Sequence, residues 1–227
     1  TGKQRKLYDG QAIHLRSLLD HQSEEEFNNS RFQVLTELTR LRQICCDPAL
    51  CFEDYGDETA KTDACMELVQ SAVDGGHRLL VFSQFTSMLD ILSSRLDGEH
   101  VEHFMITGAT PKEKRLQLVN AFNGGAVPVF LISLKAGGVG LNLTGADMVV
   151  HYDPWWNLAA QNQATDRAHR IGQTHSVQVY KLIASDTVED RILRLQEEKQ
   201  RLSDAILPSG DSFVASLTPD QLLELLE

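Results

Sequence analysis

The pattern of hydrophobic positions divides the chain into a helical opening and a longer part in which two kinds of element alternate. Apolar side chains recur at three- and four-residue steps through the first fifty residues, which predicts helices separated at Asn28–Ser30. Pro48 and the acidic stretch Phe52–Glu58 then predict a surface connection. We therefore expect a domain boundary near residue 58.

From about residue 60, short apolar runs alternate with amphipathic stretches. The runs show little period-two alternation, which is typical of strands covered on both faces. The predicted strands are Arg78–Ser83, His103–Ile106, Val129–Ser133, Met148–His151 and Val177–Ile183. Because strand, helix, strand order at this spacing requires parallel pairing through crossovers, we predict an α/β fold with a doubly wound, mostly parallel sheet.

Residues that start and stop helices mark where the helices lie. Glycine pairs at Gly75–Gly76 and Gly124–Gly125 are expected to end two of them. Thr110–Glu113 predicts a capping box with proline at the first helical position. A long helix is expected over Asp186–Pro208, and a second capping box at Thr218–Gln221 predicts a short terminal helix.

The composition is that of an ordinary soluble globular protein, since 42% of the 227 residues are apolar and 23% are charged. No apolar run approaches the roughly 18 residues needed to cross a bilayer, so no membrane partner is expected. The eight histidines are scattered, and the four cysteines match no zinc-binding spacing. We expect reduced, mostly packed thiols and no metal site. The cysteines are Cys45, Cys46, Cys51 and Cys65.

The net charge of −11 argues against a nucleic-acid-binding protein with a uniformly basic surface. The excess acid is not evenly spread, however. Residues 47–75 hold one base and eight acids, and residues 184–227 hold four bases and ten acids. Residues 76–183 hold nine bases and eight acids, so this part is nearly neutral and its charge does not exclude contact with DNA.

Ligands of open parallel sheets bind beyond the carboxyl ends of the strands, so the loops there are the first candidates for a site. The strand Val129–Ser133 is followed by a glycine-rich loop over Leu134–Asn142, whose backbone N–H groups can approach an anion. Such a loop is a weak signal alone, because glycines after a strand often serve only a tight turn. It is not a phosphate-binding lysine loop, since Gly-x-x-x-x-Gly-Lys-Ser/Thr occurs nowhere in the chain.

A stronger signal follows the strand Met148–His151. Asn157 is a good helix N-cap and predicts a helix that reaches about Arg170. Gln163, Asp166 or Arg167, and Arg170 recur on it at three- and four-residue steps, which predicts an amide and two guanidiniums along one face. Fixed cationic donors of this kind suit the oxygens of a transferring phosphoryl group. The alternative is a solvated helix face on which Asp166 neutralises one arginine.

The stretch Gln163–Gln173, with Asp166-Arg167-x-His169-Arg170-Ile-Gly-Gln, resembles the sixth helicase motif of the SWI/SNF family of superfamily-two DNA translocases. Further stretches resemble other motifs of that family and come in the same order, so that the resemblance covers roughly residues 35–206. These stretches are Leu41–Pro48, Leu80–Phe85, Thr107–Arg115, Ser133–Leu143, Asp153–Asn157 and Asp186–Ile192.

The resemblance implies a RecA-like, helicase C-terminal lobe. Family members bind ATP and Mg²⁺ between two RecA-like lobes, of which the first carries the lysine loop and the magnesium motif. The second supplies arginine fingers and contacts double-stranded DNA. The chain contains neither motif of the first lobe, so it is expected to be the second lobe, to need the N-terminal lobe as its partner, and not to hydrolyse ATP alone.

The same resemblance implies three domains and a place in the cell. Residues 1–58 would form a helical protrusion and acidic linker, residues 59–185 the RecA-like lobe, and residues 186–227 a brace helix and tail helix. The tail resembles those of bacterial members. We expect a monomer that remodels protein–DNA complexes, located in the cytoplasm with the nucleoid in a bacterium or in the nucleus in a eukaryote.

Roles carry over from the family to individual positions. Arg167 and Arg170 resemble the arginine fingers. The residues expected to bind or sense nucleotide are Gly138, Gly140, Asn142, Gln163 and Asp166. The residues expected to contact the DNA backbone are Ser83, Gln84, Thr107, Thr110, Lys135 and Trp156. For Trp156 the alternative is a packed core aromatic, which is the favoured interpretation of Trp155.

Two other functions compete with this interpretation. One is a non-catalytic DNA- or protein-interaction module that keeps a degenerate motor fold, against which the intact arginines and glycine loop argue. The other is a small oxidoreductase that binds a dinucleotide at the glycine-rich loop. It is excluded because no Gly-x-Gly-x-x-Gly opens a helix after the first strand.

Overall fold

The computed structural model describes residues 2–20, 24–137, 141–168, 176–202 and 217–226, and the chain divides into two compact units. The helical unit comprises Thr1–Ala60, Pro154–Asn157 and Ile183–Glu227. The sheet unit comprises Lys61–Asp153 and Leu158–Leu182. The chain thus leaves the sheet unit at Pro154 for four residues and returns to it at Leu158.

The sheet unit is built on a five-stranded, all-parallel sheet with strand order β2-β3-β1-β4-β5, which confirms the predicted α/β class. The central strands β1, β3 and β4 are buried along their whole length. All five predicted strands are present, three of them with the predicted bounds. The strands are β1 (Leu79–Ser83), β2 (His103–Ile106), β3 (Val129–Ser133), β4 (Met148–His151) and β5 (Gln178–Lys181).

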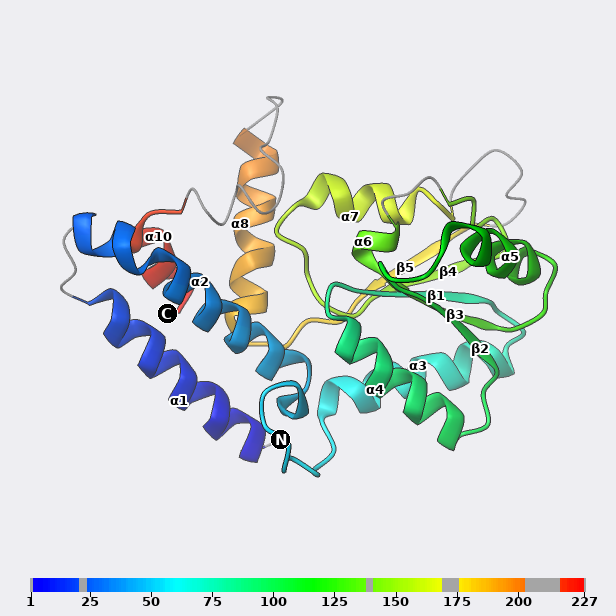
Figure 1. Cartoon of the computed structure of the whole chain (residues 1–227), viewed down its shortest axis with the longest axis horizontal. Coiled ribbons are helices and arrows are strands. Elements are labelled where there is room, and N and C mark those ends of the chain that lie inside the picture. Colours follow the sequence, from blue (N-terminus) through cyan, green and yellow to red (C-terminus); the bar gives the residue numbers. More distant parts are fainter. Residues whose placement is uncertain (1, 21–23, 138–140, 169–175, 203–216, 227) are drawn as a thin grey trace. The chain divides into compact units, whose positions relative to one another are not determined.

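Helices cover both faces of this sheet, as right-handed crossovers require (Figure 1). The helices α3 (Ala60–Asp74) and α4 (Thr86–Gly98) lie on one face. The other face carries α5 (Lys112–Asn123), the single turn α6 (Leu134–Gly137) and α7 (Leu158–Thr165). Both glycine pairs end their helices as predicted, and the second glycine of each pair has the positive φ that favours glycine there.

The strand β5 differs from its prediction. It was expected to be covered on both faces, but three of its four residues are exposed and Val179 keeps 44% of its surface accessible. The strand pairs only with β4 and forms an edge of the sheet. Its polar residues Gln178 and Lys181 agree with this position, because an edge strand is less covered than a central one.

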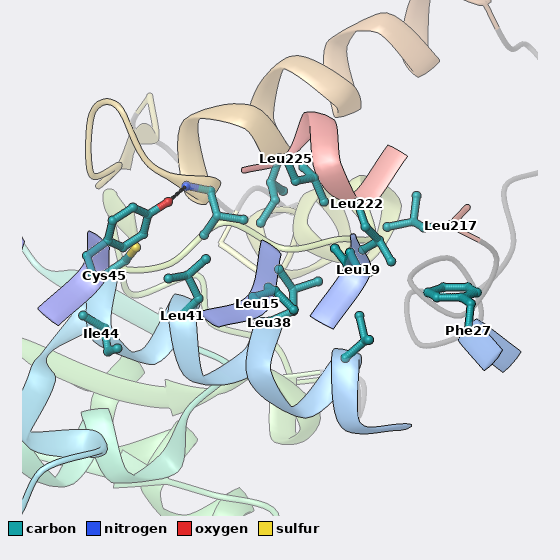
Figure 2. Close-up of a cluster of buried hydrophobic side chains, with 14 residues drawn as sticks. Leu15, Leu19, Phe27, Leu38, Leu41, Ile44, Cys45, Leu217, Leu222 and Leu225 are labelled. Atoms are coloured by element: carbon teal, nitrogen blue, oxygen red, sulfur yellow. Dashed lines mark hydrogen bonds between the residues drawn. The ribbon is translucent and has the colours of Figure 1, made fainter. Parts of the chain in front are cut away.

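The helical unit contains the long helices α1 (Gly2–Leu19), α2 (Glu24–Cys46) and α8 (Val188–Leu202), the short helix α10 (Pro219–Glu224) and the 3-10 turn η1 (Pro48–Leu50). Apolar side chains from α1, α2, α8 and the region of α10 meet in one buried cluster, the helical core (Figure 2). Its members are Tyr8, Leu15, Leu19, Phe27, Val34, Leu38, Leu41, Ile44, Cys45, Val188, Ile192, Leu217, Leu222 and Leu225.

The predicted break at Asn28–Ser30 is wrong, because these residues lie inside α2. The buried side chains of Phe27 and Val34 lie on either side of them and hold this part of the helix to the core. The hydroxyl of Ser30 donates to the carbonyl of Phe27, which keeps its polar group satisfied within the helix. Tertiary packing therefore overrides the weak helix propensity of asparagine and serine.

The amino terminus of α8 is fixed to α1 and α2. The Tyr8 hydroxyl accepts a 2.7 Å hydrogen bond from the backbone N–H of Val188, drawn as a dashed line in Figure 2. Burial raises the pKa of Tyr8, so the hydroxyl stays protonated. The buried Glu189 carboxylate accepts from the N–H of Ala184 at 2.9 Å and lies 3.8 Å from the Sγ of Cys46, which donates to it.

The predicted capping box at Thr218–Gln221 is confirmed, with both of its hydrogen bonds formed at the start of α10. The predicted stop at Pro208 lies outside the described residues. In the part of the chain that the structure describes, no helix has the length and apolar character to cross a membrane. All four cysteines are free thiols, and burial raises the pKa of Cys65 to about 12.

Candidate functional site

The candidate site lies along the carboxyl edge of the central strands, where three buried strands end in polar residues. Ser83, Ser133 and His151 end β1, β3 and β4, and each is at most 2% exposed. The sheet register brings Ser83 beside Ser133 and places His151 beside Phe82. Polar groups are thus gathered at the edge where parallel α/β sheets bind their ligands.

Ser83 and Gln84 shape the turn that leaves β1. The Ser83 hydroxyl accepts a hydrogen bond from the N–H of Phe85 at 3.1 Å. The N–H of Gln84 donates to both carboxylate oxygens of Asp153, each at 3.1 Å. Asp153 is the second residue after β4. These two bonds therefore join the loops that follow the neighbouring strands β1 and β4.

The loop after β2 is a closed turn between Thr107 and Thr110. The Thr110 hydroxyl accepts from the N–H of Thr107 at 3.0 Å, and Arg115 donates to the carbonyl oxygens of Gly108 and Thr110 at 2.9 and 2.7 Å. The predicted capping box of Thr110 with Glu113 is therefore wrong. The Thr110 oxygen is taken by the turn, and α5 begins after Pro111 with no side-chain cap.

The loop after β3 begins with the helical turn α6, which includes Lys135. The structure describes the backbone of Lys135 but not its side chain. Gly138 and Gly140 also lie outside the described residues. Asn142 is exposed, and its carbonyl accepts from the side-chain amide of Asn123 at 2.8 Å. The Asn123 side-chain oxygen in turn accepts from the N–H of Gly145 at 2.9 Å, so α5 holds the far end of this loop.

His151 links the sheet edge to α7 and was not singled out by sequence reasoning. Its Nε2 lies 2.9 Å from the Thr165 hydroxyl, which itself donates to the carbonyl of Gln161. Burial lowers the pKa of His151 to about 4, with a smaller contribution from Lys181, so the ring is neutral at pH 7. The Nε2–H tautomer fits these bonds, because the Thr165 proton is already donated. The signal available in the sequence was a histidine that ends an apolar strand.

The helix α7 is shorter than predicted. It ends at Thr165 and is followed by turns, in which the N–H groups of Arg167 and Ala168 bond three residues back, to the carbonyls of Ala164 and Thr165. The carbonyl of Arg167 accepts from the N–H of Leu143 at 3.0 Å. Gln163 and Asp166 are exposed, whereas Arg167 is only 6% exposed. Gln163 and Arg167, predicted to lie along one helix face, thus differ in exposure, and Arg167 lies beyond the end of the helix. Arg170 lies outside the described residues.

Trp156 lies in the helical unit and is half-buried. Its side chain packs against the helical core, and the guanidinium of Arg42 lies 5.0 Å from the centroid of its ring. Its neighbour Trp155 is half-buried as well. The packing that sequence reasoning gave as the alternative for Trp156 is thus present.

Comparisons with known proteins agree with the fold. The model of the helicase conserved C-terminal domain matches residues 60–172. A putative ATP-dependent helicase/translocase, YwqA of Bacillus subtilis, is 36% identical over 99% of this chain and 25% of its own length. An uncharacterized ATP-dependent helicase of Mycoplasma pneumoniae is 40% identical over 88% of this chain and 19% of its own.

Solved structures agree in the same way. The Sulfolobus solfataricus SWI2/SNF2 ATPase C-terminal domain superposes with a TM-score of 0.80 at 29% identity, covering all of this chain and 94% of that one. The chain belongs to the SWI/SNF family. The ATPase core of the same organism, solved with double-stranded DNA, gives a TM-score of 0.83 at 31% identity, and this chain covers 48% of it.

This SWI/SNF chain corresponds to the C-terminal, RecA-like lobe of the family. It spans between about a fifth and a quarter of the curated relatives named above. Among the residues that the structure describes, no three His, Cys, Asp or Glu side chains gather as metal ligands. The polar groups on the described sheet edge are largely hydroxyl, amide and N–H groups, which suit phosphate oxygens better than they suit Mg²⁺.

Proposed function

We propose that this lobe is the second half of a DNA-dependent ATPase motor that moves along double-stranded DNA and remodels protein–DNA complexes. The observation that carries the proposal is the sixth-motif block Gln163–Gln173, which follows the fourth strand of a RecA-like sheet. Its relatives of matching sequence are described as ATP-dependent helicases. A first lobe in the parent protein would supply the other half of the ATP site.

Arg167 and Arg170 are the residues proposed to stabilise charge on the γ-phosphate of ATP that the first lobe holds. Arg167 lies in the turn that follows α7, and α7 is fixed to the sheet edge through His151 and Thr165. Arg167 also accepts a backbone hydrogen bond from Leu143, which couples it to the glycine-rich loop. We assign the arginine finger to Arg170 before Arg167, because the Arg167 side chain is buried within this chain.

The remaining nucleotide contacts are proposed to come from the glycine-rich loop and from the exposed polar residues beside it. Gly138, Gly140 and Asn142 would shape a loop that senses nucleotide, and Gln163 and Asp166 would couple it to the arginines. The 227 residues hold no lysine loop, so the first lobe would bind most of the phosphate and the Mg²⁺ ligands would lie there.

Contact with DNA is proposed to run through the backbone phosphates without base readout. The Sulfolobus core was solved with double-stranded DNA, which supports this class of partner. Short donors at the strand ends and the nearby Lys135 would contribute here, with Trp156 coupling the DNA path to ATP turnover. A motor with this partner would act as a monomer and reside with the DNA, in the bacterial nucleoid or the eukaryotic nucleus.

Steady-state ATP hydrolysis tests the proposal. The 227-residue chain alone is expected to show no turnover above background, with or without double-stranded DNA, because half of the ATP site is absent. The parent protein is expected to hydrolyse ATP and to do so faster with double-stranded DNA. Substantial DNA-stimulated turnover by the chain alone would contradict the half-site assignment.

A further inference from the structure

Arg42 is a buried cation in α2, with only 3% of its surface exposed. Arginine is almost never buried to this degree without partners, because polar contacts must replace the water that the guanidinium loses. Its contacts therefore indicate which part of the molecule it holds in place.

Two of these contacts lie in one short segment of the helical unit, Pro154–Asn157. The Nη2 of Arg42 donates a 2.6 Å hydrogen bond to the carbonyl oxygen of Pro154, 112 residues further along the chain. Its guanidinium also lies over the ring of Trp156, 5.0 Å from the centroid. One planar cation thus contacts both the backbone and the indole of the same segment, a geometry that a lysine ammonium would reproduce only in part.

This segment is the connection between β4 and α7, after which Arg167 follows. Pro154 is buried, and its carbonyl oxygen accepts the hydrogen bond from Arg42. Its ring nitrogen carries no proton, so the carbonyl is its only hydrogen-bonding backbone group. Trp156 is half-buried against the helical core, of which α2 supplies a large part. The orientation of Trp156 therefore depends on α2 and on Arg42 in particular.

We propose that Arg42 is a positioning residue that holds Trp156 and the Pro154 carbonyl, and that DNA-stimulated ATP turnover depends on this contact. The proposal rests on the function proposed above, in which Trp156 couples DNA to ATP hydrolysis. Arg42 acts through Trp156 and is assigned no contact with nucleotide or DNA itself.

The position of Trp156 can be measured in the 227-residue chain by fluorescence. The chain has two tryptophans, so Trp155→Phe leaves Trp156 as the only indole. In this background, Arg42→Gln is expected to shift the emission to longer wavelength and to raise the acrylamide quenching constant about twofold, because the ring loses its covering cation. Arg40→Gln is the matched control, since Arg40 is exposed on the same helix and lies 5.5 Å from the ring centroid of Phe52.

The effect on turnover is measured in the parent protein. Arg42→Gln is expected to lower the ratio of DNA-stimulated to basal ATP turnover about tenfold, with basal turnover and KM for ATP within about twofold of wild type. Arg42→Lys is expected to recover part of the ratio, and Arg40→Gln to keep all of it. Combining Arg42→Gln with Trp156→Leu is expected to add little to the loss caused by Trp156→Leu alone, because the two residues act as a unit.

Unchanged emission and quenching in a folded Arg42→Gln chain would overturn the positioning role. An unchanged stimulation ratio would equally overturn the proposal, because Arg42 would then hold Trp156 without consequence for turnover. If Arg42→Gln fails to fold, the Trp156 fluorescence and the stimulation ratio are measured on Arg42→Lys instead. Wild-type values in both measurements would overturn the proposal. A wild-type parent without DNA-stimulated turnover would instead contradict the proposed function, and the fluorescence result would still report on Arg42.

Discussion

At the scale of single residues, His151 is the group whose burial has the clearest consequence. Its pKa is about 4 in the folded chain, against an ordinary value of 6.5. Between these values the unfolded chain binds a proton that the folded chain does not, so stability falls as the pH is lowered from about 6.5 toward 4. Between pH 7 and pH 5 this residue is expected to remove roughly 2 kcal/mol from the free energy of unfolding, measured by urea denaturation.

The variant His151→Gln tests that assignment, since glutamine does not titrate. It is expected to flatten the pH dependence of the unfolding free energy between pH 7 and pH 5, whatever its effect at pH 7. His14→Gln is the control, because His14 is exposed on α1. An equal slope in wild type and His151→Gln would show that His151 does not cause the acid sensitivity.

At the scale of elements, the start of α8 depends on one hydroxyl from α1. Tyr8→Phe would leave the buried N–H of Val188 without the oxygen that accepts its hydrogen bond. Such a loss costs about 1–3 kcal/mol, so the free energy of unfolding should fall by that amount and amide exchange should rise in the first turn of α8. Tyr180→Phe, which removes an exposed hydroxyl bonded to Gln178, should change neither. Equal behaviour of the two variants would refute the role of Tyr8.

The strands and several helix ends could be predicted from the sequence because local chemistry determines them. Continuous apolar runs predicted β3 and β4 with their observed bounds, and Thr218 formed its predicted cap. Tertiary contacts account for most of what was missed. The Thr110 hydroxyl bonds to Thr107 instead of capping α5, and the Arg167 carbonyl bonds to Leu143 where α7 was expected to continue.

The location of the candidate site could be predicted from the sequence. The burial and the contacts of its side chains could not. The motifs placed Ser83 at the carboxyl edge of the sheet, where the structure has it. Spacing alone could not reveal that Arg167 is buried, that Arg42 contacts Trp156, or that His151 bonds to Thr165. These depend on contacts between residues far apart in the chain.

At the scale of the whole molecule, the charge distribution predicts weak DNA binding by this lobe alone. Most of the excess acid lies in residues 47–75 and 184–227, and the part that carries the motifs is nearly neutral. Few phosphates would be neutralised, so binding should be weak and should fall steeply with salt. Fluorescence anisotropy with a labelled duplex measures this. A Kd in the micromolar range or tighter at physiological salt would contradict the prediction.

The central claim is that this lobe completes an ATP site whose other half lies on a first lobe. The most direct measurement is kcat for ATP in the parent protein carrying Arg170→Ala, with nucleotide binding measured in parallel. Loss of an arginine finger is expected to lower kcat about 1000-fold or more while ATP still binds through the first lobe. Arg194→Ala, which removes an exposed arginine paired with Asp190, should leave kcat unchanged. Near-normal turnover by Arg170→Ala would contradict the account.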